Sequence, residues 1–142
     1  MKCARIETDH GAIDVELYDD VAPKTVQSFL DLATKGFYDG LVFHRVVADF
    51  MVQGGCPHGT GTGGPGYTVP DEVEGNPHRH LTGTLSLANT GTPNSGGSQF
   101  FLCHRPLPHL DGQHTVFGRI TRNIDLLYKV RTGDRILRIA AL

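Results

Sequence analysis

The chain has 142 residues, of which 39% are hydrophobic and 20% are charged, and its formal net charge is −2. This length and composition indicate one globular domain over residues 1–142 and exclude a disordered chain. Because lysines and arginines are scattered, the composition also argues against a nucleic-acid-binding or anionic-membrane-binding surface.

The sequence contains no segment that predicts export or membrane insertion. Met1-Lys2-Cys3 passes directly into charged residues, without the apolar segment of a secretory signal. No apolar run approaches the roughly 18 residues of a membrane span. Three widely spaced cysteines, Cys3, Cys56 and Cys103, fit reduced thiols better than a disulfide framework. We therefore expect a cytoplasmic protein, and nothing in the sequence requires more than a monomer.

The N-terminal part of the chain predicts a β-hairpin followed by a helix. Apolar and polar residues alternate on both sides of Asp9-His10-Gly11, as in two strands joined by a turn. Pro23 suits the first turn of a helix, and Gly36 is placed to end it. Between them, one apolar face is predicted by the helical spacing of Val26, Phe29, Leu30 and Ala33.

Short strands are expected in most of the remaining sequence. Their ranges are 41–47, 50–53, 84–88, 98–103, 115–120 and 135–141. A second short helix is expected over 123–131, with Asn123 as its N-cap. The glycine-rich segment 54–66 is expected to be a surface loop. Together these elements predict a mainly β fold, a closed or nearly closed barrel capped by helices.

Two motifs formally match enzyme signatures, but their contexts do not support either one. Residues 59–64 match the dinucleotide-binding pattern G-x-G-x-x-G, yet a proline follows where a helix must begin. Residues 96–100 lack the final glycine of the hydrolase pattern G-x-S-x-G. A triad of Ser98, Asp111 and His114 is conceivable, but neither residue order nor turn chemistry favours it.

The eight histidines raise the question of a metal site. Residues 56–58, 78–80 and 103–104 each combine histidine with histidine or cysteine, and each could donate ligands. None of them has the paired spacing C-x-x-C or H-E-x-x-H that makes a zinc site specific. We therefore expect solvated loop histidines, with no metal and no cofactor.

Several polar side chains occur in strand-like segments that lack an obvious catalytic carboxylate: Arg45, Gln53, Asn89 and Gln99, with His114 beyond them. On a pleated strand Met51 and Gln53 share one face. By the same alternation, Gln99 and Phe101 share a face of another strand. Each of these two strands thus places a hydrogen-bonding side chain beside a large apolar one. This combination is typical of a shallow apolar pocket with a polar rim. Taken alone, Arg45 would be interpreted as an ordinary surface arginine.

Four motifs together resemble the cyclophilin family of peptidyl-prolyl cis–trans isomerases. They are FHRVVADFMVQGG, GTGGPGY, LSLANTGTPNSGGSQFF and LDGQHTVFG, in this order and with family-like spacing. The flanking helix and strands extend the resemblance over nearly the whole chain. The stretch GTGGPGYTVPDE is similar to the short prokaryotic form.

The resemblance implies a closed eight-stranded antiparallel β-barrel capped by two α-helices, with the active site on its outer face. It also implies rotation about X-Pro bonds in proline-containing peptides and in unfolded or flexible protein segments, which assists folding. By motif position, the catalytic residues would be Arg45, Phe50, Gln53 and His114. The substrate-binding residues would be Met51, Gly61, Ala88, Asn89, Thr90, Gln99, Phe101, His109 and Leu110.

Three positions depart from the pattern of the family. His109 stands where many members carry a tryptophan associated with tight cyclosporin binding, so we expect weakened binding of that drug. Ala48 replaces a common proline and Leu87 a common methionine, and both changes are expected to be tolerated. Two alternative functions stay open: a module of this fold that binds proline-containing segments without turnover, and a metal-responsive protein.

Overall fold

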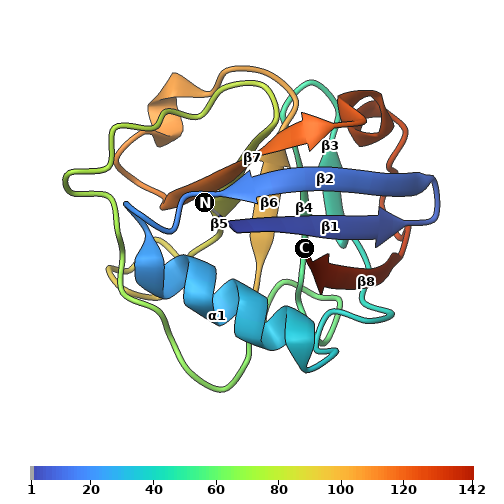
Figure 1. Ribbon diagram of the computed structural model, residues 1–142, viewed down its shortest axis with the longest axis horizontal. Helices are drawn as coiled ribbons and strands as arrows, with labels where there is room; N and C mark the ends of the chain where they lie inside the picture. The colour runs from blue at the N-terminus through green and yellow to red at the C-terminus, as the bar shows by residue number, and fades with distance from the viewer. Residues whose placement is uncertain (1) are drawn as a thin grey trace.

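The computed structural model, which describes residues 2–142, consists of one curled eight-stranded sheet and one α-helix (Figure 1). The strand order is β3-β4-β6-β5-β7-β2-β1-β8, and all pairs are antiparallel. The strands are β1 Lys2–Thr8, β2 Gly11–Leu17, β3 Arg45–Val47, β4 Met51–Gly54, β5 Thr84–Leu87, β6 Phe100–Cys103, β7 Val116–Arg122 and β8 Ile136–Ala141. The helices are α1 Pro23–Thr34 and the short 3-10 helices η1 Pro108–Leu110 and η2 Ile124–Tyr128.

The sheet forms an open half-barrel, so the prediction of a closed barrel was wrong. Its edge strands are β3 and β8. Strand β3 begins only at Arg45 and has three residues. It is therefore too short to form a continuous ladder of hydrogen bonds with β8. The gap is crossed instead by the single bridge between Val42 and Arg135 and by backbone hydrogen bonds that join residues 40–43 to 133–136.

The predicted second α-helix was also wrong, because residues 124–128 form the 3-10 helix η2. Asn123 precedes it in the left-handed conformation, with φ 65°, and its side chain does not cap the helix. Its Nδ2 atom instead donates a hydrogen bond of 2.8 Å to the Ala12 carbonyl on β2. The Asn123 side chain, which was predicted to cap a helix, thus binds the sheet instead.

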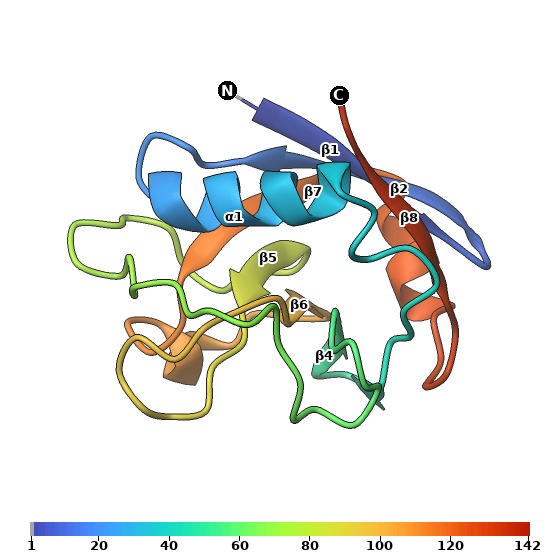
Figure 2. The ribbon, with the colours of Figure 1, turned by 90° about the horizontal axis from the view of Figure 1, so that it is seen from below.

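Helix α1 follows the prediction closely and covers an open end of the curled sheet (Figure 2). Phe29 is buried, with its ring centroid 5.5, 5.7 and 5.3 Å from those of Tyr38, Phe100 and Phe117. The predicted glycine stop is confirmed. The Gly36 N–H donates to the Ala33 carbonyl and the Phe37 N–H donates to the Leu32 carbonyl, which is the Schellman ending of a helix.

The first turn of α1 is capped from outside the helix. Ala22 occupies the N-cap position and has no side-chain acceptor. Glu72 supplies one, because its carboxylate accepts hydrogen bonds from the backbone N–H groups of Lys24 at 3.3 Å and Thr25 at 2.7 Å. A negative group at this position also complements the helix dipole. The long segment between β4 and β5 is therefore tied to the helix.

The helices formed by residues 2–142 include none that is both long and apolar enough to span a lipid bilayer.

We predict that Gly55→Ala destabilises the fold by about 2 kcal/mol or more, since it adds backbone strain to a steric clash. Gly55 has a φ of +93°, and a Cβ atom there would lie 2.4 Å from the Ser98 carbonyl oxygen. The matched control is Gly64→Ala, because a Cβ atom at Gly64 meets nothing within 4 Å. Urea unfolding of the two variants measures the difference, and equal midpoints would contradict the prediction.

Candidate active site

One row of side chains crosses four strands on the face of the sheet opposite the main core. Arg45 of β3 lies opposite Gln53 of β4, which lies opposite Phe101 of β6. Phe101 in turn lies opposite Ser86 of β5. Directly opposed residues of antiparallel strands point to the same face. The register therefore places the Arg45 guanidinium and the Phe101 ring on one surface, two strands apart.

A second, smaller hydrophobic cluster lies on this same face, apart from the main core. Its buried members are Met51, Phe101, Cys103 and Leu107. Phe50, Ala88 and Leu110 are partly buried against it. The cluster gives the outer face an apolar floor, because these side chains pack together instead of facing water.

A cavity of about 230 Å³ opens over this floor. Nine of the residues predicted from the sequence line it: Arg45, Phe50, Met51, Gln53, Ala88, Asn89, Phe101, Leu110 and His114. Gly61, Thr90 and Gln99 line an adjoining groove of about 510 Å³, which Gln53, Ala88 and Asn89 also border. His109 lines neither space, and its ring stacks on Phe50 at a centroid distance of 6.1 Å.

The Arg45 guanidinium is a free cation at the rim of the cavity. Its Cζ atom lies 5.9 Å from the centroid of the Phe50 ring, within the range of a cation–π contact. No carboxylate of residues 2–142 forms an ion pair with it. Its N–H donors are therefore available to a ligand in the cavity.

The two glutamine side chains form a chain of hydrogen bonds that reaches the glycine-rich loop 54–66. The Gln53 Nε2 atom donates to Gln99 Oε1 at 3.0 Å. The Gln99 Nε2 atom donates to the carbonyls of Gly61 and Gly63 at 2.9 and 3.0 Å. This leaves Gln53 Oε1 as an acceptor beside the cavity, whereas the Gln99 amide is occupied in holding the loop.

Asn89 presents its backbone to the groove while its side chain is bound internally. The Nδ2 atom donates to the Gln113 carbonyl at 2.9 Å, and Oδ1 accepts from the Gly91 N–H at 2.9 Å. Within residues 2–142, neither the backbone N–H nor the carbonyl of Asn89 has a hydrogen-bond partner. An unpaired backbone N–H and carbonyl beside a groove can form hydrogen bonds with an extended peptide.

His114 and His80 hold the Phe101 ring from two sides. The His114 ring meets Phe101 edge to face at 5.3 Å, and its Nδ1 atom lies 3.1 Å from the Leu87 carbonyl, which fixes a proton on Nδ1. The His80 ring is parallel to Phe101, with a centroid distance of 5.8 Å and an interplanar angle of 8°. The floor of the cavity is thus clamped by two imidazole rings.

His80 lies against Phe101 at the floor of the cavity, a position that the sequence did not reveal, and its prediction as a solvated loop histidine was wrong. Only 1% of it is exposed. Its Nδ1 atom lies 2.9 Å from Asp111 Oδ1, and its Nε2 atom lies 2.8 Å from Ser86 Oγ. Burial lowers the pKa of His80, although the hydrogen bond to Asp111 acts in the opposite direction. Neither the sequence around His80 nor that around Asp111 indicated this pairing.

The hydrolase triad considered from the sequence is not assembled. Ser98 is buried and donates to the Gly55 carbonyl at 2.7 Å. Asp111 binds His80 instead of His114. Among residues 2–142, moreover, no group of three or more His, Cys, Asp or Glu side chains is placed to hold a metal ion.

The loop 54–66 is fixed at its base by a buried thiol. The backbone N–H groups of Gly61 and Gly63 each lie 3.3 Å from Cys56 Sγ. Burial raises the pKa of the Cys56 thiol, but these and neighbouring backbone N–H donors outweigh it and lower the pKa to about 7. Since Gln99 holds the carbonyls of the same two glycines, the loop is bound from both sides.

Comparison with known proteins identifies the class to which this fold and site belong. The family model for the cyclophilin type peptidyl-prolyl cis-trans isomerases matches residues 3–138. A peptidyl-prolyl cis-trans isomerase of Synechococcus elongatus is 55% identical over 141 residues, covering 98% of this chain and 95% of the relative. Peptidyl-prolyl cis-trans isomerase B of Bacillus subtilis is 56% identical over 126 residues, covering 89% of this chain and 87% of the relative.

Solved structures agree with these relatives. A cyclophilin type peptidyl-prolyl cis-trans isomerase from Cryptosporidium parvum matches with a TM-score of 0.92 and 31% identity, covering 99% of this chain and 97% of that one. The chain therefore belongs to the cyclophilin family, and it is a peptidyl-prolyl cis–trans isomerase.

We predict that Cys56 ionises near pH 7, whereas Cys103, whose pKa burial raises to about 12, stays protonated. Because the folded state favours the Cys56 thiolate, this group adds stability that is present above the ordinary thiol pKa and lost as pH falls through about 7. Thiolate absorbance followed during a pH titration measures the ionisation of both cysteines. The step near pH 7 should vanish in Cys56→Ser and persist in Cys103→Ser; the reverse pattern would refute the assignment.

Proposed function

We propose that the isomerase acts by holding a proline ring over Phe101 while Arg45 donates a hydrogen bond to the prolyl nitrogen. The row that joins Arg45, Gln53 and Phe101 carries this proposal, because it sets a cation that has no counter-ion among residues 2–142 beside an apolar cavity.

The reaction needs only that the twisted amide be bound better than the planar one. Conjugation of the amide sets a barrier of about 18–20 kcal/mol to rotation. Twisting breaks the conjugation and returns a lone pair to the prolyl nitrogen. A donor aimed at that nitrogen therefore stabilises the transition state selectively. Arginine suits this role because it stays protonated and presents several donors in a fixed fork.

The apolar floor contributes a second effect. Phe101 and Met51 are 4% and 2% exposed, so the proline ring would bury its methylene groups against them. A weakly polar surrounding also strengthens the hydrogen bond from Arg45. Since no covalent bond is made or broken during rotation, the proposed mechanism requires neither a nucleophile nor a cofactor.

The substrate class follows from the groove beside the cavity. The backbone of Asn89 and the free Oε1 atom of Gln53 offer hydrogen bonds to an extended chain on either side of the proline. A Cryptosporidium parvum relative, with a TM-score of 0.90 and 31% identity, has a crystal structure determined in the presence of the dipeptide Ala-Pro. We infer that this chain acts on X-Pro bonds of flexible protein segments and so assists their folding.

We predict that Arg45→Ala lowers kcat/KM for a proline tetrapeptide by about a hundredfold or more, the usual effect of removing a transition-state donor. Arg45→Lys keeps the charge but not the fork and should recover only part of the activity. Arg122→Ala, which removes an exposed arginine of β7, should leave the activity unchanged.

A protease-coupled isomerisation assay measures all three variants, and circular dichroism checks their folding. Full activity in folded Arg45→Ala would exclude the proposed donor. Tight peptide binding by the unaltered protein, with no cis–trans exchange in NMR spectra, would instead indicate a binding module without turnover.

We further propose that His109 weakens the binding of cyclosporin. His109 does not line the cavity and contacts it only through its stacking on Phe50, and an indole in its place would offer a larger apolar face. His109→Trp should therefore tighten cyclosporin binding by about tenfold, or about 1.4 kcal/mol. Leu137→Trp adds an indole at an exposed position of β8 and is the control. Isothermal titration calorimetry measures the affinity of each variant for cyclosporin. Equal affinities in His109→Trp and Leu137→Trp would contradict the role of His109.

A further inference from the structure

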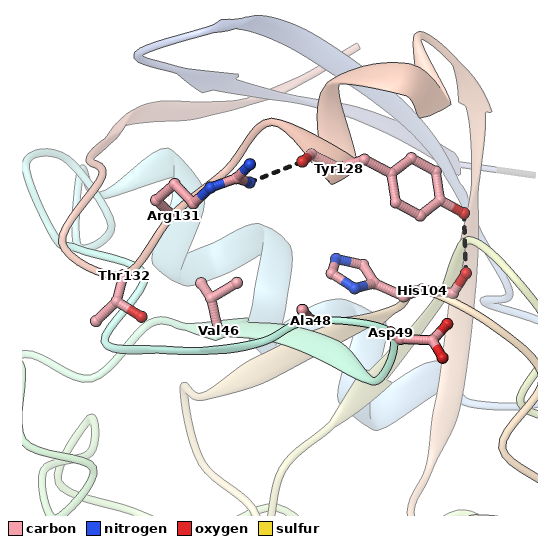
Figure 3. A pocket seen from close by; sticks show the side chains of 7 residues that line it. All are labelled: Val46, Ala48, Asp49, His104, Tyr128, Arg131 and Thr132. Atoms are coloured by element: carbon pink, nitrogen blue, oxygen red, sulfur yellow. Dashed lines mark hydrogen bonds between the residues drawn. The ribbon is translucent and has the colours of Figure 1, made fainter.

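A second cavity, of about 320 Å³, lies behind the β3–β4 hairpin. Its lining residues come from the β3–β4 hairpin, from the position directly after β6, and from the end of η2 and the segment after it: Val46, Ala48, Asp49, His104, Tyr128, Arg131 and Thr132 (Figure 3). Val46 lines it, and since neighbouring residues of a strand face opposite ways, this cavity lies on the reverse side from Arg45. Its volume is at the lower end of the roughly 300–1,000 Å³ typical of ligand pockets.

The buried imidazole of His104 has no hydrogen-bond partner for either nitrogen among residues 2–142. Only 8% of the residue is exposed, and in Figure 3 its ring lies between Tyr128 and the hairpin segment at Ala48. The Tyr128 hydroxyl donates to the backbone carbonyl of His104 at 2.8 Å, which positions the residue but leaves the ring unbound. Buried polar groups are normally satisfied, so an unpartnered ring facing a cavity calls for a ligand.

The charge state of His104 follows from its surroundings. Burial lowers the pKa of the ring, which favours its neutral form. The nearby Leu127 carbonyl and Asp49 favour the charged form, and Arg131 opposes it. The Leu127 carbonyl lies close enough to the ring to act on its pKa as an acceptor, but neither ring nitrogen has a hydrogen-bond partner of standard geometry among residues 2–142. An anion placed against the ring would favour its protonation.

Arg131 supplies a fixed cation at the rim of the same cavity. Its Nη1 atom donates to the carbonyls of Tyr128 at 2.8 Å and Val130 at 3.2 Å, which orients the guanidinium. In the described part of the chain no carboxylate forms an ion pair with its side chain. Asp49, on the opposite rim, is 89% exposed at its side chain and has Arg105 at 3.9 Å, so its charge is largely solvated.

We propose that this cavity binds a small organic carboxylate with an apolar body. The carboxylate would accept hydrogen bonds from the guanidinium of Arg131 and the imidazole of His104, in the geometry that arginine offers to carboxylates. The apolar body would lie against Val46, Ala48 and the Tyr128 ring. This site is separate from the cavity over Phe101 and does not depend on the proposed catalytic roles.

The chemistry predicts a pH dependence of binding. A bound carboxylate raises the pKa of His104, so binding takes up a proton. Affinity should therefore rise as pH falls from about 8 to about 6, a range in which a carboxylic acid stays ionised. Replacing His104 by a residue that does not titrate should remove this dependence.

The test titrates sodium benzoate into ¹⁵N-labelled protein, with benzamide as the neutral ligand of matched shape. We expect benzoate to shift the amide signals of Val46, Ala48 and Thr132, and to bind at least tenfold more tightly than benzamide. Arg131→Gln should weaken benzoate binding at least tenfold, whereas Asp49→Asn should not weaken it. His104→Gln should bind benzoate with an affinity that no longer changes between about pH 8 and about pH 6.

Several results would overturn the proposal. They are equal affinities for benzoate and benzamide, signal shifts confined to other residues, and unchanged binding in Arg131→Gln. The dispersion of the amide spectrum confirms that each variant is folded. Because the readout is binding at this cavity, its failure leaves the isomerase mechanism untouched, and Arg131→Gln should keep full isomerase activity.

Discussion

The antiparallel register of β3, β4 and β6 is the constraint on which the site depends. A shift of one residue in any of these pairings would turn Arg45, Gln53 or Phe101 to the core side. The register is held by the alternate residues Val46, Val52 and Leu102, which pack with the main core on the opposite face. The core that stabilises the fold therefore also determines which side chains face the substrate.

The sequence was sufficient to predict the features that depend on local patterns. Helix α1, its glycine stop and the approximate strand positions follow from periodicity and turn chemistry. The grouping of nine side chains around one cavity followed from the family resemblance, because the residues come from segments far apart in the sequence. From the periodicity alone, Arg45 would have been interpreted as an ordinary surface arginine.

The features that the sequence could not reveal depend on tertiary contacts. Closure of the barrel depends on whether β3 is long enough to pair with β8, and the apolar run before Arg45 gave no sign that strand pairing begins only there. The predicted helix after Asn123 failed because that side chain binds β2 instead of its own helix. His80 and His104 were both expected to be solvated loop residues, yet contacts with other segments of the chain bury both of them.

The double attachment of the loop at Gly61 and Gly63 has a consequence for the thermodynamics of catalysis. A glycine-rich segment left free would lose roughly 1–2 kcal/mol of backbone entropy per residue if a substrate had to order it. Here the carbonyls are held by Gln99 and the N–H groups by Cys56 before any peptide arrives. The groove is preorganised, so a passing chain can enter and leave quickly without refolding one of its walls.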